Sequence, residues 1–230
     1  ARWTYVDSES GLSADAIAAG DGGQIYIWSD EATYFYGSLS AEGGAQSGDG
    51  GFAEISGKLN LVYDGSVDLS AQQGSTGTLL FDPRDIVIKA GSGTNTVGDD
   101  AVLPELLDTS DNQFAFTLFE DTLEALASGT SIILEAAIDI TIESLNGGEL
   151  TLAEGNNIRF TADANNNGTG SFFMNPSNTI RTAGGTVRIM AGDDDRGSVV
   201  GNIDTSRDAG LVGNISISDP DQLSVGALNA

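Results

Sequence analysis

The sequence predicts an all-β protein built as a parallel β-helix, or β-solenoid, in which short strands stack coil upon coil. The first observation is a repeat, because glycines that open or close short strands recur 28 positions apart. These pairs are Gly22 and Gly50, Gly37 and Gly65, and Gly185 and Gly213. The second observation is that the apparent strands are short and end in glycine or asparagine corners. A two-sheet sandwich gives no reason for a constant step, whereas each corner of a solenoid recurs once per coil.

The chain divides into a leading segment and one solenoid domain. Residues 1–21 hold a single weak strand, at 3–6, and are predicted to lead into the first coil. Residues 22–230 are predicted as one domain of roughly eight coils, about 4.8 Å apart. Within its first coils, Ile25 and Ile27 alternate with polar neighbours, and this period of two places one strand face in a core and the other in water.

Two irregular features are expected in the middle of the domain. Residues 90–113 break the strand pattern and are predicted to project from the stack as a loop. A short helix near 121–128 should follow, because Asp121 begins a sequence with capping-box spacing. A helix this short is marginal alone, so its Leu123 and Leu126 are expected to pack on the stack.

From residue 132 onward, short alternating strands return and continue to the last residue. Their apolar members, together with those of the early coils, are predicted to form one continuous core. The side chains expected in it are Ile25, Ile27, Ile55, Leu79, Ile138, Ile140, Ile142, Leu152, Val187, Ile189, Ile215 and Ile217.

The composition narrows the classes of function. With 9 basic and 34 acidic residues, the formal net charge is −25, which argues against nucleic acid and anionic membranes as partners. No apolar run approaches the roughly 20 residues that a spanning helix needs, so no membrane insertion is expected. The chain has no histidine and no cysteine, so the usual nucleophile–base pairs are missing. We therefore expect no enzyme and assign no catalytic residue, although carboxylates alone would suffice for some polysaccharide-processing enzymes.

Several segments resemble filamentous-haemagglutinin-like large exoproteins. The most specific run reads GGFAEISGK at 50–58 and GTLLFDPRDI at 77–86. The likeness also includes residues 27–30, 37–44, 67–71, 122–126, 148–152 and 161–164, and extends over roughly 20–230. It implies a right-handed β-helix, secretion by a two-partner (type V) route in Gram-negative bacteria, and a surface-adhesive or structural role. The family's N-terminal secretion domain, with its Asn-Pro-Asn motifs, is not in this sequence, so the chain is expected to be an interior or processed piece of the passenger.

A candidate calcium loop lies at 163–168. Asp163, Asn165 and Asn167 place oxygens at the first, third and fifth positions before Gly168, as in the opening of an EF-hand loop. Met174 stands where that loop needs a bidentate glutamate. The sequence thus predicts at most weak calcium binding and no other cofactor, with a corner held by side-chain-to-backbone hydrogen bonds as the alternative.

A second, weaker cation candidate is the triplet Asp193, Asp194 and Asp195. Three adjacent carboxylates repel one another, and a bound cation or the neighbouring Arg196 would relieve the repulsion. A solvated corner is the alternative.

Aromatic side chains gather in the first coil. Tyr26, Trp28, Tyr34 and Tyr36 are candidates for stacking on the rings of a surface glycan, provided that they share a face. Phe35 alternates with its neighbours, so part of this group must belong to the core.

Together these observations predict an extracellular structural or adhesive module at the bacterial cell surface. A cut β-helix exposes unpaired strand edges at each end, so the partners expected are further copies stacked end to end, or adjoining coils of a longer parent chain. The alternative is a polysaccharide-binding or polysaccharide-processing β-helix that uses calcium. A groove lined by clustered carboxylates and arginine would favour the enzyme, and a flat stack with scattered charges would not.

Overall fold

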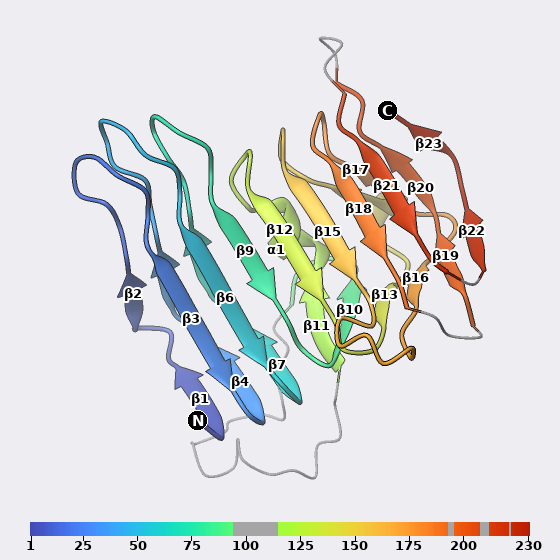
Figure 1. Ribbon diagram of the computed structural model, residues 1–230, viewed down its shortest axis with the longest axis horizontal. Helices are drawn as coiled ribbons and strands as arrows, with labels where there is room; N and C mark the ends of the chain where they lie inside the picture. The colour runs from blue at the N-terminus through green and yellow to red at the C-terminus, as the bar shows by residue number, and fades with distance from the viewer. Residues whose placement is uncertain (94–114, 193–195, 208–211, 221) are drawn as a thin grey trace.

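The computed structural model describes residues 1–93, 115–192, 196–207, 212–220 and 222–230, and it is a β-solenoid built almost entirely of parallel strands (Figure 1). Each regular coil has three strands, one on each side of the stack. The first side is a seven-stranded sheet, and its strands begin 28, 26, 53, 26, 30 and 28 residues apart. In order these are β3 (Gln24–Ser29), β6 (Phe52–Gly57), β9 (Thr78–Phe81), β12 (Ser131–Glu135), β15 (Asn157–Thr161), β18 (Val187–Met190) and β21 (Ile215–Ser218).

The second and third sides follow the same order along the stack. The second side consists of β1 (Trp3–Val6), β4 (Ala32–Phe35), β7 (Asn60–Tyr63), β11 (Ala115–Phe119), β10 (Asp85–Lys89), β13 (Ile140–Ile142), β16 (Phe172–Met174), β19 (Ser198–Val200) and β22 (Leu223–Val225). The third side consists of β2 (Gly11–Ser13), β5 (Ser38–Ser40) and β8 (Ser66–Asp68), then β14 (Glu149–Thr151), β17 (Thr179–Arg181), β20 (Asn202–Asp204) and β23 (Leu228–Asn229). A 3-10 turn, η1 (Asn146–Gly148), leads into β14.

The predicted solenoid is confirmed, with about seven coils rather than eight. The shortfall arises at one place, because 53 residues separate the starts of β9 and β12, about twice the usual step. The projecting loop predicted at 90–113 falls largely on residues 94–114, which lie outside the described part of the chain.

The leading segment is more regular than the sequence suggested. Strands β1 and β2 pair with β4 and β5 in the same parallel register that the later coils use. Residues 1–21 therefore form two sides of a further coil instead of only running into the first one.

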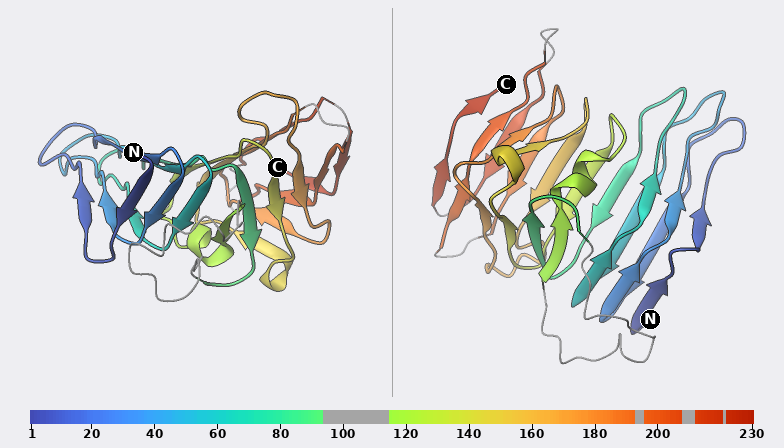
Figure 2. Two further views of the ribbon diagram at one scale, coloured as in Figure 1. Left: turned by 90° about the horizontal axis from the view of Figure 1, so that it is seen from below. Right: turned by 180° about the vertical axis from the view of Figure 1, so that it is seen from behind.

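Strand β11 lies out of sequence order. It pairs with β10 on one side, and its other side lies against β7, although β10 precedes it in the chain. Its Phe116 enters the core, with its ring centroid 5.3 Å from that of Phe81. On the second side, two strands, β11 and β10, thus lie between β7 and β13, whereas on the first side only β9 lies between β6 and β12. The extra strand makes the second side about 4.8 Å longer along the axis of the stack. The stack accordingly bends with the seven-stranded sheet on its concave side (Figure 2).

The single short helix, α1 (Glu120–Glu124), occupies the place of a third-side strand between β8 and β14 (Figure 2). It is shorter than predicted, and the capping box does not form: Phe119 occupies the N-cap, without a side-chain hydrogen bond. Instead the buried Glu120 carboxylate accepts hydrogen bonds from the backbone N–H groups of Gly91 and Asn146. Leu123 and Leu126 pack on the core as expected. Within the described residues, no helix has the length and apolar character needed to cross a bilayer.

The core runs through the stack without interruption, and most of its predicted members are fully buried. The exceptions have a common cause at the ends: Ile25, Ile215 and Ile217 lie on the outermost strands of the seven-stranded sheet and are covered on one side only. Ile138 is half-buried because it lies in the corner before β13.

The repeated glycines mark points where one coil touches the next through backbone alone. A Cβ at Gly185 would overlap the carbonyl oxygen of Asn156, and one at Gly213 would overlap that of Gly185. A Cβ at Gly50 would likewise lie only 2.5 Å from the backbone nitrogen of Gly77 in the next coil. This lack of space explains the glycines at the corners before β6, β18 and β21, whereas the aligned positions before β12 and β15 are Thr130 and Asn156.

We expect Gly185→Ala to lower the free energy of unfolding by at least about 1–3 kcal/mol, since the new methyl group must push a rigid backbone aside. Urea denaturation measures the effect. Gly11→Ala is the matched control, because its nearest neighbour would be the rotatable Ser38 hydroxyl at 3.3 Å. Equal losses for the two variants would contradict the explanation.

Candidate ligand-binding groove

A row of chemically reactive side chains crosses the outer face of the seven-stranded sheet. The strand register aligns Trp28 with Ser56 and Glu135 with Thr161. Asp82 falls between these pairs, one residue beyond Phe81, which is aligned with both Ile55 and Leu134. Because neighbouring strands are about 4.8 Å apart, side chains from five coils stand next to one another along the axis of the stack.

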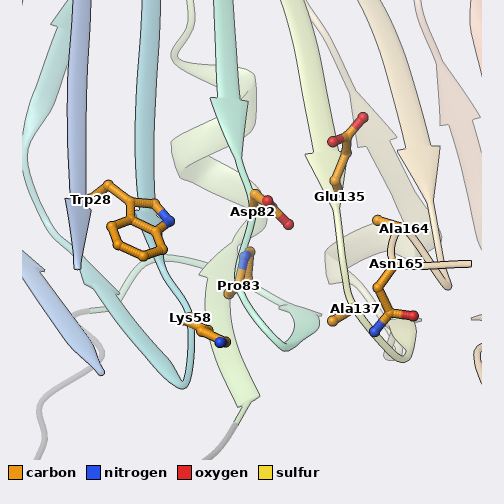
Figure 3. A pocket seen from close by; sticks show the side chains of 8 residues that line it. All are labelled: Trp28, Lys58, Asp82, Pro83, Glu135, Ala137, Ala164 and Asn165. Carbon is orange, nitrogen blue, oxygen red and sulfur yellow. The ribbon is translucent and has the colours of Figure 1, made fainter. Parts of the chain in front are cut away.

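This row borders a groove with a volume of about 290 Å³. The side chains that line it are Trp28, Lys58, Asp82, Pro83, Glu135, Ala137, Ala164 and Asn165. Figure 3 shows Trp28 on one flank and Asn165 on the other, with Asp82 and Glu135 between them. The groove therefore unites a residue of the predicted aromatic group with a residue of the predicted calcium loop.

Asp82 is the electrostatically unusual member of the groove. Burial raises its pKa from the ordinary 3.8 to about 6, and the nearby carboxylates of Glu135 and Glu54 add to the rise. Among the described residues, its carboxyl group has no hydrogen-bond or ion-pair partner. Asp82 thus stays partly protonated at mildly acidic pH.

Glu135, one coil further along, has a different environment. Its Oε1 accepts a hydrogen bond from Nη2 of Arg159, on the adjacent strand β15. The guanidinium balances the negative charge of Glu135 but leaves that of Asp82 uncompensated. The groove therefore presents two neighbouring carboxyl groups, only one of which is paired with a cation.

Three polar atoms near the carboxyl groups have no protein partner within the described structure: the Ser56 hydroxyl, the Thr161 hydroxyl and Nε of Arg159. All three belong to outward positions of strands β6 and β15, which flank the carboxyl pair. A buried polar atom without a hydrogen bond costs about 1–3 kcal/mol, and this cost falls beside the carboxyl pair.

The aromatic candidates separate into two groups. Tyr26 and Trp28 lie on the outer face of β3 and are 59% and 45% exposed. Tyr34 is only 4% exposed, in a small cluster with Ala32 and Val62 against which Tyr36 also packs. Tyr34 therefore cannot contact a ligand at the surface, and only Tyr26 and Trp28 share the face of the groove.

The candidate calcium loop forms a self-contained corner. Oδ1 and Oδ2 of Asp163 accept hydrogen bonds from the backbone N–H groups of Asn167 and Gly168, at 2.8 and 3.0 Å. Asn165 Oδ1 accepts from the same N–H of Asn167 at 3.1 Å, and the Asn167 carboxamide oxygen accepts from Thr169. These bonds support the structural alternative, and a calcium ion would have to compete with them for each oxygen.

The second cation candidate, Asp193 to Asp195, lies outside the described residues. Its neighbour Arg196 forms a two-pronged ion pair with Asp139, with N–O distances of 2.7 and 3.0 Å. Across the described ranges, no three acidic side chains converge in a geometry that would hold a metal ion.

Sequence reasoning missed Asp82 and Glu135. The alternation of the strands could have shown that both face outward, because Asp82 follows the outward Leu80 by two positions and Glu135 follows the outward Ile133 by two positions. However, 53 residues separate them. The long insertion concealed that the two belong to adjacent strands.

Comparisons of the chain with known protein families, with curated proteins and with solved structures find no match. The groove and the stacking of the coils are therefore the basis on which a function can be argued.

The raised pKa of Asp82 has a definite effect on stability. The folded state holds this proton more tightly than the unfolded chain, so the free energy of unfolding falls as the pH rises from 3.8 to about 6. Asp82→Asn should remove this loss and stabilise the protein at pH 7.5, by up to about 1 kcal/mol after allowance for solvent screening.

Thermal or urea unfolding at pH 4.5 and pH 7.5 tests this prediction. The advantage of Asp82→Asn should appear at pH 7.5 and shrink at pH 4.5. Asp64 and Asp85, whose pKa values burial also raises, titrate in both proteins and cancel in the comparison. The exposed Asp121→Asn serves as control, and an Asp82→Asn effect that is independent of pH would contradict the assignment.

Proposed function

We propose that the protein is an extracellular adhesive module that binds a glycan chain in the groove on its concave side. The observation that carries the proposal is a groove in which the exposed Trp28 and the Asn165 carboxamide flank two carboxyl groups (Figure 3). An aromatic face stacks on the apolar face of a sugar ring, and carboxylates and hydroxyls hydrogen-bond its hydroxyl groups. Such a pairing of one large apolar surface with a few polar groups is typical of ligand sites.

The direction of the row supports a chain-like ligand. Its members come from successive strands about 4.8 Å apart, close to the advance of one sugar along an extended polysaccharide. A linear glycan lying along the axis would meet one coil per sugar. A compact small molecule would use only part of this row.

The location at a bacterial cell surface rests on the resemblance to filamentous-haemagglutinin-like exoproteins. The solenoid architecture supports it, because a stack of coils holds binding groups away from its point of attachment without needing disulfides. The formal charge of −25 also keeps such a module soluble.

The polysaccharide-processing alternative uses the same groove. Asp82 holds a proton at mildly acidic pH and could act as a general acid, and glycoside hydrolysis uses a second carboxyl group, for which Glu135 is the neighbour in the groove. Binding and cleavage are separated by analysing the glycan for shortened products after incubation.

A structural role has independent support at the ends of the stack. Leu223, Val225 and Leu228 occupy inward positions of the last coil, yet they are 42%, 36% and 51% exposed. At the opposite end, β1, β2 and β3 are the outermost strands of their sheets. All strands run parallel, so the edges of β1, β2 and β3 in a second copy run in the same direction as the strand edges of the last coil. We therefore propose that copies stack end to end.

For glycan binding, we expect Trp28→Ala to weaken the affinity at least about tenfold, or 1.4 kcal/mol, because the stacking surface is lost. A glycan array identifies a ligand, and calorimetry with that ligand measures the change. Tyr5→Ala is the control, since Tyr5 is equally exposed, at 43%, on another side of the stack. Equal affinities of Trp28→Ala and wild type would remove the groove from consideration.

For end-to-end stacking, the double change Leu223→Asp with Leu228→Asp should abolish association, because it places charge in the apolar end. Sedimentation velocity over a range of concentrations measures it. Leu59→Asp changes an exposed leucine, at 41%, away from the ends and should leave association intact. A wild type that stays monomeric at every concentration would instead assign the end to adjoining coils of a parent chain.

A further inference from the structure

We infer that the groove selects a glycan of positively charged amino sugars, in which one sugar places its ammonium group between Asp82 and Glu135 while another ring of the same chain stacks on Trp28. This inference rests on the proposed glycan-binding function and narrows it to a chemical class. It stands on the arrangement of the groove, in which an aromatic face and two carboxyl groups from adjacent coils converge.

The charges around the groove do not balance. Asp82 faces the carboxylates of Glu135 and Glu54 on the two neighbouring strands. Arg159 is committed to Glu135. Lys58 lines the groove, but among the described residues its ammonium is not within ion-pair distance of either carboxyl group. A cationic ligand would supply the charge that these side chains do not pair.

Each alternative class of glycan fits less well. An acidic polysaccharide would add negative charge beside the carboxyl pair, on a protein whose formal charge is already −25. A neutral glycan would form hydrogen bonds in the groove but leave the repulsion between the carboxyl groups in place. An amino sugar carries hydroxyls that form such hydrogen bonds and also an ammonium that offsets the two negative charges.

Trp28 fits the same class. An aromatic face attracts cations, and tryptophan does so most strongly among the aromatic side chains. An amino sugar stacked on the indole therefore gains from both its apolar ring face and its charge. Tyr26, exposed on the same strand face two residues away, widens this aromatic surface in the direction of the strand, across the axis of the stack.

Binding should also depend on pH in a characteristic way. As the pH falls below about 6, Asp82 takes up its proton and one of the two negative charges disappears. As the pH rises, the amine of the sugar loses its proton instead. The affinity should thus pass through a maximum and fall on either side, as for any interaction between an acid and a base of different pKa.

The test uses two oligosaccharides with the same β-1,4-linked backbone: a glucosamine hexamer and its fully N-acetylated form, which is neutral. Calorimetry is done at pH 6.5 and low ionic strength. We expect the glucosamine hexamer to bind at least tenfold more tightly, and Asp82→Asn with Glu135→Gln to abolish this preference. Asp82→Asn alone should reduce it, which keeps the test valid if Glu135→Gln disturbs Arg159.

The control must match the change in net charge. Glu9→Gln with Glu143→Gln removes two exposed carboxylates away from the groove and should preserve the preference. If this control lowers the preference as much as the groove variants do, the attraction is to the acidic surface as a whole and the inference is overturned.

The remaining outcomes distinguish a failure of the amino-sugar inference from a failure of the proposed glycan binding. Equal or tighter binding of the N-acetylated hexamer, sensitive to Trp28→Ala, overturns the amino-sugar inference but retains glycan binding. Absence of binding to both hexamers overturns the inference as well, and the glycan array then decides alone whether the proposed function survives.

Discussion

Direct contact between the backbones of successive coils is the constraint on which this structure depends. Parallel strands hydrogen-bond only at a separation of about 4.8 Å, so every corner must lie against the corner before it. Where the carbonyl of Asn156 or Gly185 occupies the place of a side chain, only glycine fits. The regular step along the sequence, the uninterrupted core and the alignment of outer side chains all follow from this contact.

The same spacing brings charged groups together whether or not their charges are compatible. Arg181 lies between the carboxylates of Glu149 and Asp204 from the coils on either side, an arrangement that neutralises charge along the stack. At the groove the opposite occurs, since Asp82 and Glu135 are adjacent and only one of them has a cation. The regularity of the fold makes this exception conspicuous, because here the stacking brings like charges together at a cost in stability.

The sequence predicted the structure best where a residue's position depends on its near neighbours in the chain. Alternation identified Ile27, Ile55 and Ile140 as core residues, and the glycine spacing identified the solenoid. It was less informative where position depends on residues far away. Neither the carboxyl pair, separated by the insertion, nor the burial of Tyr34 has a local signature. Asp121 had the capping-box pattern, but Glu120 was drawn into the stack by the N–H groups of Gly91 and Asn146.

The position of β11 determines the order in which the chain can fold. Solenoids are able to grow by adding each new coil to the one just completed, which requires only nearest-neighbour contacts. That route fails here, because β10 is synthesised before the strand that separates it from β7. The coils up to β8 and those from β12 onward can each propagate locally, but their junction closes only after residue 119 is available. One non-local event therefore joins two locally growing units, and the rate of folding depends on closing that loop rather than on the number of coils.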